Sequence, residues 1–306
     1  QAIDSSHILK WCHGGIVLQR VHMGIDDSHV LTILPSREKS MPAESQRDFF
    51  EEHGYLIIDD LLSSDELDMC RSEIERLHVL AADLEATGKP EARQFQGEPH
   101  AEATHQDDGL PLLRKVENTG QFSEPFRTLS THDRLIPVIQ QLIGPDLLLY
   151  RSTLMLKPAH HGSAHALHQD SAYWPMEPPT LVTVSIALNE ATAENGCIQV
   201  IPGSHKWGLQ EWGLITRTDD AITSRDDIDV SKRIDVPLRA GSAVCFHSLM
   251  VHGSGANQSP HPRNTALYAY FSPVVRYAPK EGQPTQRSFP VIAGLDGQAE
   301  FTLTAS

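Results

Sequence analysis

Strand-like segments follow one another through the second half of the sequence, and no helical pattern separates them. Residues 147–157 alternate with a period of two, and further strand-like runs lie at 181–188, 197–201, 236–238, 243–247 and 266–271. Glu194-Asn195-Gly196 and Arg239-Ala240-Gly241 supply turn signals between them. Because parallel strands need crossover helices, this order predicts one mainly β structure, a sandwich or a barrel.

Helical patterns precede these strands, so helices are expected on the outside of the β structure and mostly near its N-terminal side. A short helix is expected at 44–52, before a strand at 55–58. Ser63 and Glu66 form a capping box, and the apolar residues behind it recur at helical spacing: Leu67, Cys70, Ile74, Leu77 and Leu84. Residues 88–109 are expected to form an irregular loop. Another helix is expected to begin at Thr131 and to end near Leu142, before Gly144-Pro145.

The chain divides into two parts of different character. Residues 1–40 show no sustained periodicity and are interpreted as a leader or extension of uncertain origin, whereas 41–306 are expected to form a single domain. The sequence contains no run of about 18 apolar residues, the length of a membrane span. Four dispersed cysteines without a CxxC pair indicate thiols in a reducing compartment, so a cytoplasmic protein is expected.

The charge of the chain excludes some partners. Lys and Arg number 25 and Asp and Glu 40, which gives a net charge of −15 at pH 7. A chain this acidic repels phosphates on average, so neither nucleic acid nor an anionic membrane surface is expected as a partner. The sequence does not distinguish a monomer from a homodimer.

Seventeen histidines raise the question of a metal site, since imidazole is a common transition-metal ligand. Two His-x-Asp triplets occur. The first, His105-Gln106-Asp107, lies in the polar loop and is interpreted as incidental. The second, His168-Gln169-Asp170, follows the long strand, and its alternate positions project to the same side.

A distant histidine and an arginine complete the second triplet. The run 243–247 leads to His252, and Arg263 follows eleven residues later. His168, Asp170 and His252 would form a two-histidine, one-carboxylate facial triad, which leaves positions open on Fe(II) for a keto-acid co-substrate and O2. Arg263 would clamp the far carboxylate of that co-substrate.

These residues resemble the phytanoyl-CoA dioxygenase family of Fe(II)/2-oxoglutarate-dependent oxygenases, over roughly Phe49 to Pro273. The resemblance is strongest at 168–175, at 193–206, and at His252-Gly253-Ser254 with Arg263. It implies a double-stranded β-helix (jelly-roll, cupin-like) core, iron held by the triad, and 2-oxoglutarate held by Arg263. Further pocket residues that it implies are Ser254, Lys115 and Thr153. Ser185 stands where some members carry a bulky aromatic residue, which changes the expected shape of the pocket.

The resemblance also frames the reaction. Asp170 is present, whereas relatives that halogenate lack this carboxylate, so hydroxylation of an unactivated C–H bond of a small metabolite or natural-product intermediate is expected, with 2-oxoglutarate and O2 converted to succinate and CO2. Two alternatives stay open: the same iron chemistry ending in desaturation, epimerisation, cyclisation or an endoperoxide, and a non-catalytic cupin-like metal-binding domain. A nucleic-acid demethylase is disfavoured by the net charge of −15.

Residues next to the triad are the candidates for substrate contact: Gln169, Tyr173 and Trp174. Arg114, Lys115 and Arg151 are either the lining of a cleft for a small anion or partners in structural ion pairs. The other candidates are given structural roles: His160, His161 and His165 in a loop, His205 and His247 as hydrogen-bonding histidines, Trp207 and Trp212 over the barrel mouth, and the acidic run 219–227 as a solvated loop or lid.

Overall fold

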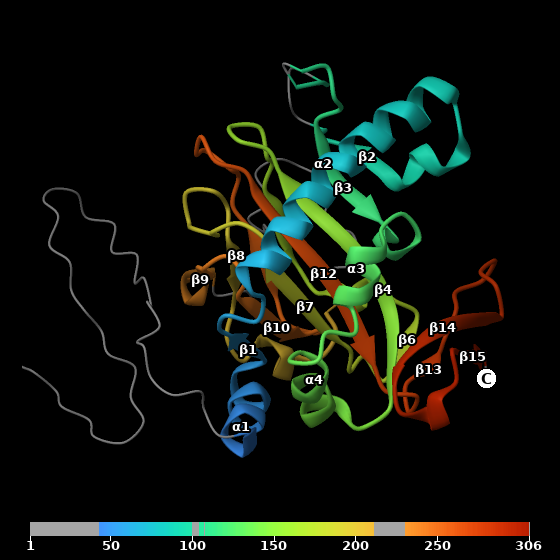
Figure 1. Cartoon of the computed structure of the whole chain (residues 1–306). Helices are drawn as coiled ribbons and strands as arrows, with labels where there is room; N and C mark the ends of the chain where they lie inside the picture. Colours follow the sequence, from blue (N-terminus) through green and yellow to red (C-terminus); the bar gives the residue numbers. More distant parts are fainter. Residues whose placement is uncertain (1–42, 100–103, 107, 211–229, 306) are drawn as a thin grey trace, which may run out of the picture. The chain divides into compact units, whose positions relative to one another are not determined.

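Two antiparallel sheets carry the fold in the computed structural model, which describes residues 43–99, 104–106, 108–210 and 230–305 (Figure 1). The large sheet runs in the order β1 (Tyr55–Ile58), β10 (Ala243–His247), β7 (Val182–Ala187), β12 (Arg263–Phe271), β4 (Leu147–Lys157), β14 (Gln286–Ala293) and β15 (Glu300–Thr304). At β4 it also pairs with β3 (Leu113–Glu117), which pairs with β2 (Phe95–Gly97). The neighbours in space are not neighbours in sequence, as in a jelly roll.

The small sheet has the order β5 (His165–His168), β11 (His252–Ser254), β8 (Ile198–Val200) and β9 (Ile234–Val236). A separate ribbon joins β6 (Met176–Glu177) and β13 (Arg276–Tyr277). This is the mainly β, double-stranded β-helix architecture that the sequence predicts.

Helices cover the outer face of the large sheet (Figure 1). They are α1 (Ala43–His53), α2 (Ser64–Thr87), α3 (Glu124–Leu129) and α4 (Ile136–Ile143). The capping box of Ser63 and Glu66 begins α2, and the predicted apolar stripe of α2 is buried in the core. Alternate residues of β12 enter the same core, where the Tyr268 and Tyr270 hydroxyls donate to the carbonyls of Phe126 (2.7 Å) and Ser130 (2.8 Å).

The opposite side chains of the large sheet form what we call the inner face, which looks toward the small sheet. It consists of residues at alternate positions of three neighbouring strands: Arg151, Thr153, Met155 and Lys157 of β4, Arg263, Thr265 and Leu267 of β12, and Ser185 of β7. The strand period of two places all of them on one side of the sheet. Every one of them lines the cavity described below.

Some expectations about the limits of helices, strands and loops were wrong. The helix expected from Thr131 begins at Ile136, because residues 130–135 form turns and Pro137 takes a first-turn position, where its missing N–H costs nothing. Residues 88–109 are not entirely irregular, because they contain a 3₁₀ helix (Pro90–Gln94) and β2. The strand expected at 236–238 lies two residues earlier, as β9.

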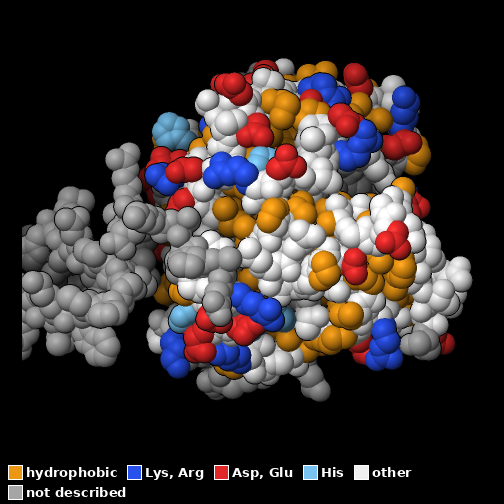
Figure 2. Space-filling model, turned by 60° about the horizontal axis from the view of Figure 1, so that its bottom comes forward, with side chains coloured by type: hydrophobic (Ala, Val, Ile, Leu, Met, Phe, Trp, Pro, Cys, Tyr) orange, Lys and Arg blue, Asp and Glu red, His pale blue; other side chains and the backbone are white. Residues whose placement is uncertain are grey.

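The structure describes one compact unit within Met41–Ser306. The predicted leader 1–40, Trp212 and the acidic run 219–227 lie outside the described residues. Among the helices described, none has the length and apolar character needed to cross a membrane. The face in Figure 2 intersperses Lys and Arg with Asp and Glu side chains and shows no basic stripe.

Candidate metal centre and its cavity

Adjacent strands of the small sheet bring the two predicted histidines together. His252 of β11 pairs directly with His168 of β5, and the rings lie 4.2 Å apart between centroids. Asp170 begins a 3₁₀ turn (Asp170–Ala172) just after β5, and its Oδ1 lies 3.6 Å from His168 Nε2 and 3.8 Å from His252 Nε2. One ligand atom from each of the three residues lies within 4.8 Å of the other two, which is the spacing of a metal-binding triad.

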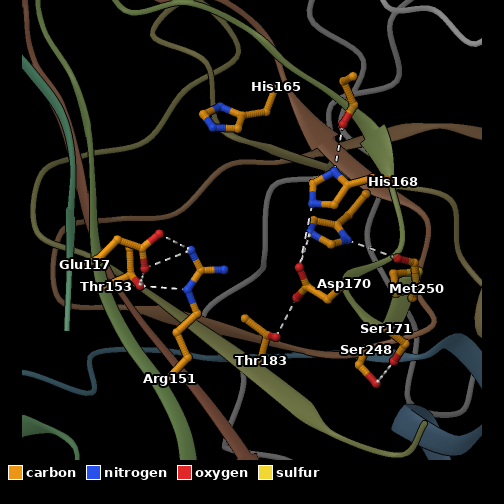
Figure 3. Close-up of polar contacts among 12 residues, drawn as sticks. Glu117, Arg151, Thr153, His165, His168, Asp170, Ser171, Thr183, Ser248 and Met250 are labelled. Atoms are coloured by element: carbon orange, nitrogen blue, oxygen red, sulfur yellow. Dashed lines mark hydrogen bonds and ion pairs between the residues drawn. The ribbon is translucent and has the colours of Figure 1, made fainter. Parts of the chain in front are cut away.

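Hydrogen bonds fix which atoms of the triad face inward (Figure 3). His168 Nδ1 donates to the carbonyl of Ala166 (2.8 Å) and His252 Nδ1 to that of Met250 (3.0 Å), so both Nε2 lone pairs stay available. Thr183 Oγ1 donates to Asp170 Oδ2 (2.7 Å), which leaves Oδ1 between the two imidazoles.

The protonation states of Asp170 and His252 also suit a metal ligand. Burial by itself raises the pKa of Asp170, but His252, His168 and Thr183 outweigh it and hold that pKa well below its ordinary value. Burial, followed by the charge of His168, lowers the pKa of His252 to about 4. Burial lowers and Asp170 raises the pKa of His168, with a net rise.

A cavity of about 1760 Å³ opens between the sheets and contains the triad. Arg263 lies in its wall, 4% exposed, with Nε donating to the Gly196 carbonyl (2.9 Å) and Nη1 to Thr265 Oγ1 (3.3 Å). Burial lowers the pKa of Arg263 to about 10, so its guanidinium is charged at pH 7. No carboxylate in the described part of the chain pairs with it, which leaves a buried cation facing the cavity.

Two hydroxyl side chains share this part of the cavity. Ser254, two residues beyond His252 on β11, is buried in the lining as the resemblance implies. Ser185 Oγ is buried without a hydrogen-bond partner among the described residues. Unpaired buried hydroxyls are uncommon, so this one fits a ligand oxygen.

Sequence reasoning missed two residues here. Lys157 is the register partner of Arg263, and its ammonium donates to the carbonyls of Ser163 (2.9 Å) and Gly255. Burial, followed by the charges of Arg263 and Arg114, puts its pKa well below the ordinary value. Thr183, which holds Asp170, is the other. Strand alternation from Thr153 to Lys157, and from Ser185 to Thr183, was the available signal.

Lys115 of β3 and Thr153 of β4 also lie in the cavity wall. Lys115 forms an ion pair with Glu117, and Arg151 holds the same carboxylate through Nη2 (3.0 and 3.2 Å). Thr153 Oγ1 donates to Glu117 Oε2 (3.3 Å) and accepts from Arg151 Nε (2.8 Å). Arg114 also lines the cavity, so all three basic residues lie in its wall, and each also has a carboxylate within ion-pair distance.

Two of the three substrate candidates line the cavity, and the third does not. Tyr173, 53% exposed, and Trp174 both line the cavity. The structure does not bring Gln169 there, because its side chain points to the other side of the strand from His168 and Asp170. The Gln169 amide donates to the carbonyls of Gly208 (3.0 Å) and Leu249 (2.7 Å), so it supports the scaffold.

The other candidate histidines divide between the cavity lining, which contains His160, His161 and His165, and structural positions elsewhere. His165 lies on β5 beside Arg114 (3.0 Å), and a loop was expected there. His205 contacts the Glu51 carbonyl (3.1 Å), and His247 Nδ1 accepts from the Leu249 amide (3.0 Å). Trp207 is exposed and does not line the cavity.

Comparison with known proteins places this architecture. The family model described as phytanoyl-CoA dioxygenase matches residues 50–265. The peroxisomal phytanoyl-CoA dioxygenase of Rattus norvegicus is 29% identical over 251 residues, which cover 78% of this chain and 70% of that one.

Solved structures share the fold. The non-haem monooxygenase ThoJ superposes with a TM-score of 0.65 at 24% identity, over 83% of this chain and 85% of that one. The non-haem α-ketoglutarate-dependent epimerase SnoN from nogalamycin biosynthesis gives a TM-score of 0.54 at 25% identity, over 78% and 85% of the two chains.

Proposed function

Since the chain belongs to the phytanoyl-CoA dioxygenase family of Fe(II)/2-oxoglutarate-dependent oxygenases, we propose that it hydroxylates an unactivated C–H bond of a small molecule. In this proposal His168, Asp170 and His252 hold Fe(II), and Arg263 holds 2-oxoglutarate. O2 is the second co-substrate, and succinate and CO2 are the co-products.

The observation that carries the proposal is the donor set of the triad. Two imidazole Nε2 atoms and one carboxylate oxygen lie within 4.8 Å of one another on a wall of the cavity. Backbone carbonyls and Thr183 orient all three. Nitrogen and oxygen donors in a two-histidine, one-carboxylate set suit Fe(II) and leave coordination positions open. The residues therefore fit the metal that the family uses.

The co-substrate pocket fits as well. A dicarboxylate needs a cation at its far end, and Arg263 offers a buried guanidinium without a carboxylate partner in the described chain. Ser254 and the unpaired Ser185 hydroxyl add donors in the same cavity. Charge-assisted hydrogen bonds of this kind orient a carboxylate strongly.

The protein's own contribution to the reaction is geometric. Bound iron, 2-oxoglutarate and O2 would together supply the oxidising power that removes hydrogen from a C–H bond. In this proposal Arg263 and Ser254 orient the co-substrate, while Tyr173 and Trp174, which also line the cavity, contact the substrate. Asp170 occupies a ligand position, which favours hydroxylation over halogenation.

A different outcome on the same iron is the second candidate. The structurally similar SnoN is an epimerase, so this fold accommodates reactions that add no oxygen atom to the substrate. Product mass separates the outcomes: hydroxylation adds one oxygen, desaturation removes two hydrogens, and epimerisation leaves the mass unchanged.

The direct test is succinate release from 2-oxoglutarate by the Fe(II)-reconstituted protein. Asp170→Ala and His252→Ala should each lower it at least about 100-fold, because removal of a ligand cripples both metal affinity and geometry. His105→Ala is the matched control and should retain full turnover: His105 is exposed and belongs to the other His-x-Asp triplet, whose Asp107 lies outside the described residues. Unchanged succinate release by either triad variant would refute the proposal, and a wild-type protein that binds iron without turnover would favour a metal-binding domain.

A further inference from the structure

Positive charge dominates the lining of the cavity, although the whole chain is acidic. Among the residues that the structure describes, six Lys and Arg side chains line it against one carboxylate, Asp170: Arg114, Lys115, Arg151, Lys157, Arg233 and Arg263. The proposed co-substrate accounts for part of this charge through Arg263. The rest requires a separate explanation, since buried or half-buried cations are costly without anions.

The cations on the inner face approach the cavity from opposite ends. Along β4, Arg151 and Lys157 are six residues apart, which is about 20 Å of extended chain, and Lys157 is the register partner of Arg263. Arg263 donates a hydrogen bond to the Thr265 hydroxyl, whereas Arg151 donates one to the Thr153 hydroxyl. A molecule between the two arginines therefore meets a guanidinium at each end.

Arg151 lies at the level of the metal ligands. Ala269 of β12 pairs with Arg151 on one side and with Thr183 on the other, and Thr183 is the residue that holds Asp170. Arg151 is also one of the charges that lower the pKa of His168. Arg151 thus approaches the metal centre from the end of the inner face that is opposite to Arg263.

Hydrogen bonds hold two of the three guanidinium nitrogens of Arg151. Nε donates to Thr153, and Nη2 donates to both oxygens of Glu117. Nη1 has no hydrogen-bond partner among the described residues, and in Figure 3 it turns from Glu117 toward the side where His168 and Asp170 lie. The side chain is 30% exposed, so a molecule in the cavity can reach it.

The charges of the proposed iron centre and co-substrate balance without Arg151. Fe(II) with Asp170 carries one net positive charge, which one carboxylate of 2-oxoglutarate neutralises, and Arg263 neutralises the other. Lys115, Arg151 and Glu117 sum to one further positive charge. Burial raises the pKa of Glu117, but Arg151 and Lys115 lower it by more, so Glu117 stays ionised. One monovalent anion would balance this group of three residues.

We propose that Arg151 anchors a carboxylate group of the substrate, so that the substrate is a small carboxylic acid with its reacting carbon beside the metal. This inference rests on the proposed function. A single free guanidinium nitrogen and a net charge of one match a carboxylate better than a dianionic phosphate, which the nearby Glu117 would repel.

The test uses the Fe(II)–2-oxoglutarate complex under argon, followed by the visible charge-transfer absorption of the iron–keto-acid chelate. Benzoate and the neutral, nearly isosteric benzamide are the probes, and each is titrated until the absorption changes. Wild-type protein should bind benzoate at least about 10-fold more tightly than benzamide. Arg151→Gln should lose that preference by about 10- to 100-fold and keep its 2-oxoglutarate affinity within about twofold.

Three controls separate the possible causes. Arg151→Lys should restore part of the preference, because it keeps the charge. Arg276→Gln, which removes an exposed cation paired with Glu177 outside the cavity, should behave as wild type. Glu117 retains Lys115 and Thr153 in Arg151→Gln, so this variant should fold, and a thermal melt checks it.

The outcomes distinguish this inference from the proposed function. Absence of the absorption in wild-type protein would contradict the function itself. With the absorption present, any of three results overturns the role of Arg151: no preference for benzoate in wild type, a preference that survives in Arg151→Gln, or an equal loss of 2-oxoglutarate affinity. Tighter binding of phenyl phosphate than of benzoate would overturn the assignment of a carboxylate.

Discussion

Arg263 is the residue whose position most needs a ligand to explain it. A buried guanidinium without a carboxylate partner is destabilising, and proteins keep such groups where a bound anion compensates for them. Arg263 donates Nε to the Gly196 carbonyl and Nη1 to Thr265 Oγ1, and its side chain lines the cavity. A bound anion would therefore supply the negative charge that Arg263 lacks in the described part of the chain.

Replacing Arg263 tests that reading. Arg263→Gln should raise the KM for 2-oxoglutarate by about 10- to 100-fold, since a charge-assisted hydrogen bond to a carboxylate is lost. Arg263→Lys should lie between this variant and wild type, because it keeps the charge without the fork geometry. Arg239→Gln, at an exposed ion pair with Asp59 and Asp60, is the control. An unchanged KM in Arg263→Gln would place the co-substrate elsewhere.

The metal triad could be predicted from the sequence because the position of each ligand is marked by the residues next to it. Two ligands lie two residues apart on an extended segment, and His252 follows a recognisable strand. The same alternation explains the failure at Gln169, because a residue between two inward ligands must point outward. Thr183 and Lys157 were missed for another reason: alternation indicates which side of the strand they face, but their roles depend on which strands become neighbours.

At the scale of elements, the turn before β8 couples the backbone to the co-substrate pocket. Gly196 has φ +80°, and its carbonyl accepts the Arg263 Nε hydrogen bond. A Cβ at this position would collide with the Gly255 carbonyl oxygen in the loop after β11. Only glycine combines the left-handed backbone with this close approach.

Gly196→Ala should therefore damage stability and 2-oxoglutarate binding together. We expect a loss of more than about 1 kcal/mol in the free energy of unfolding, because strain and the displaced loop add, and a several-fold higher KM for 2-oxoglutarate. Gly88→Ala is the matched control: Gly88 also has positive φ, at the C-terminus of α2, but a Cβ there meets open space. It should lower stability and leave KM unchanged. Equal KM values in the two variants would contradict the coupling.

Elements were predictable where their own residues show the pattern. The limits of β4 and β10 agree with the sequence, since both carry long runs of strand-forming residues. The C-terminal strands β14 and β15 were not anticipated: β14 is largely exposed and contains a proline, and β15 is a run of only five residues, although its residues alternate. They form through pairing at the edge of the large sheet, which is a tertiary effect.

At the scale of the whole molecule, an acidic chain surrounds a cationic cavity. The net charge is −15, and yet the charged lining is dominated by Lys and Arg. Field lines concentrate in a recessed cavity with low-dielectric walls, so small anions are drawn in while large polyanions are repelled from the surface. Because of this separation of charge, the net charge of the whole chain says little about the substrate.

Stability of the whole molecule should depend on pH through His247. This residue ends β10, and its Nδ1 accepts the Leu249 amide, which requires an unprotonated nitrogen. Burial, followed by the charge of neighbouring His205, lowers the pKa of His247 to about 4. In the unfolded chain its pKa is near 6.5, so between these values the unfolded state binds more protons.

The contribution of His247 is thus fully present above pH 6.5 and is lost as the pH falls toward 4, by up to about 3 kcal/mol. Denaturant unfolding of wild type and His247→Asn checks this, because Asn keeps an acceptor but does not titrate. The difference between their unfolding free energies should shift against wild type as the pH falls from 7.5 to 4.5. His105→Asn, at an exposed position, should show no such shift. If the wild-type and His247→Asn curves stay parallel across this range, His247 is not the group that makes the fold acid-sensitive.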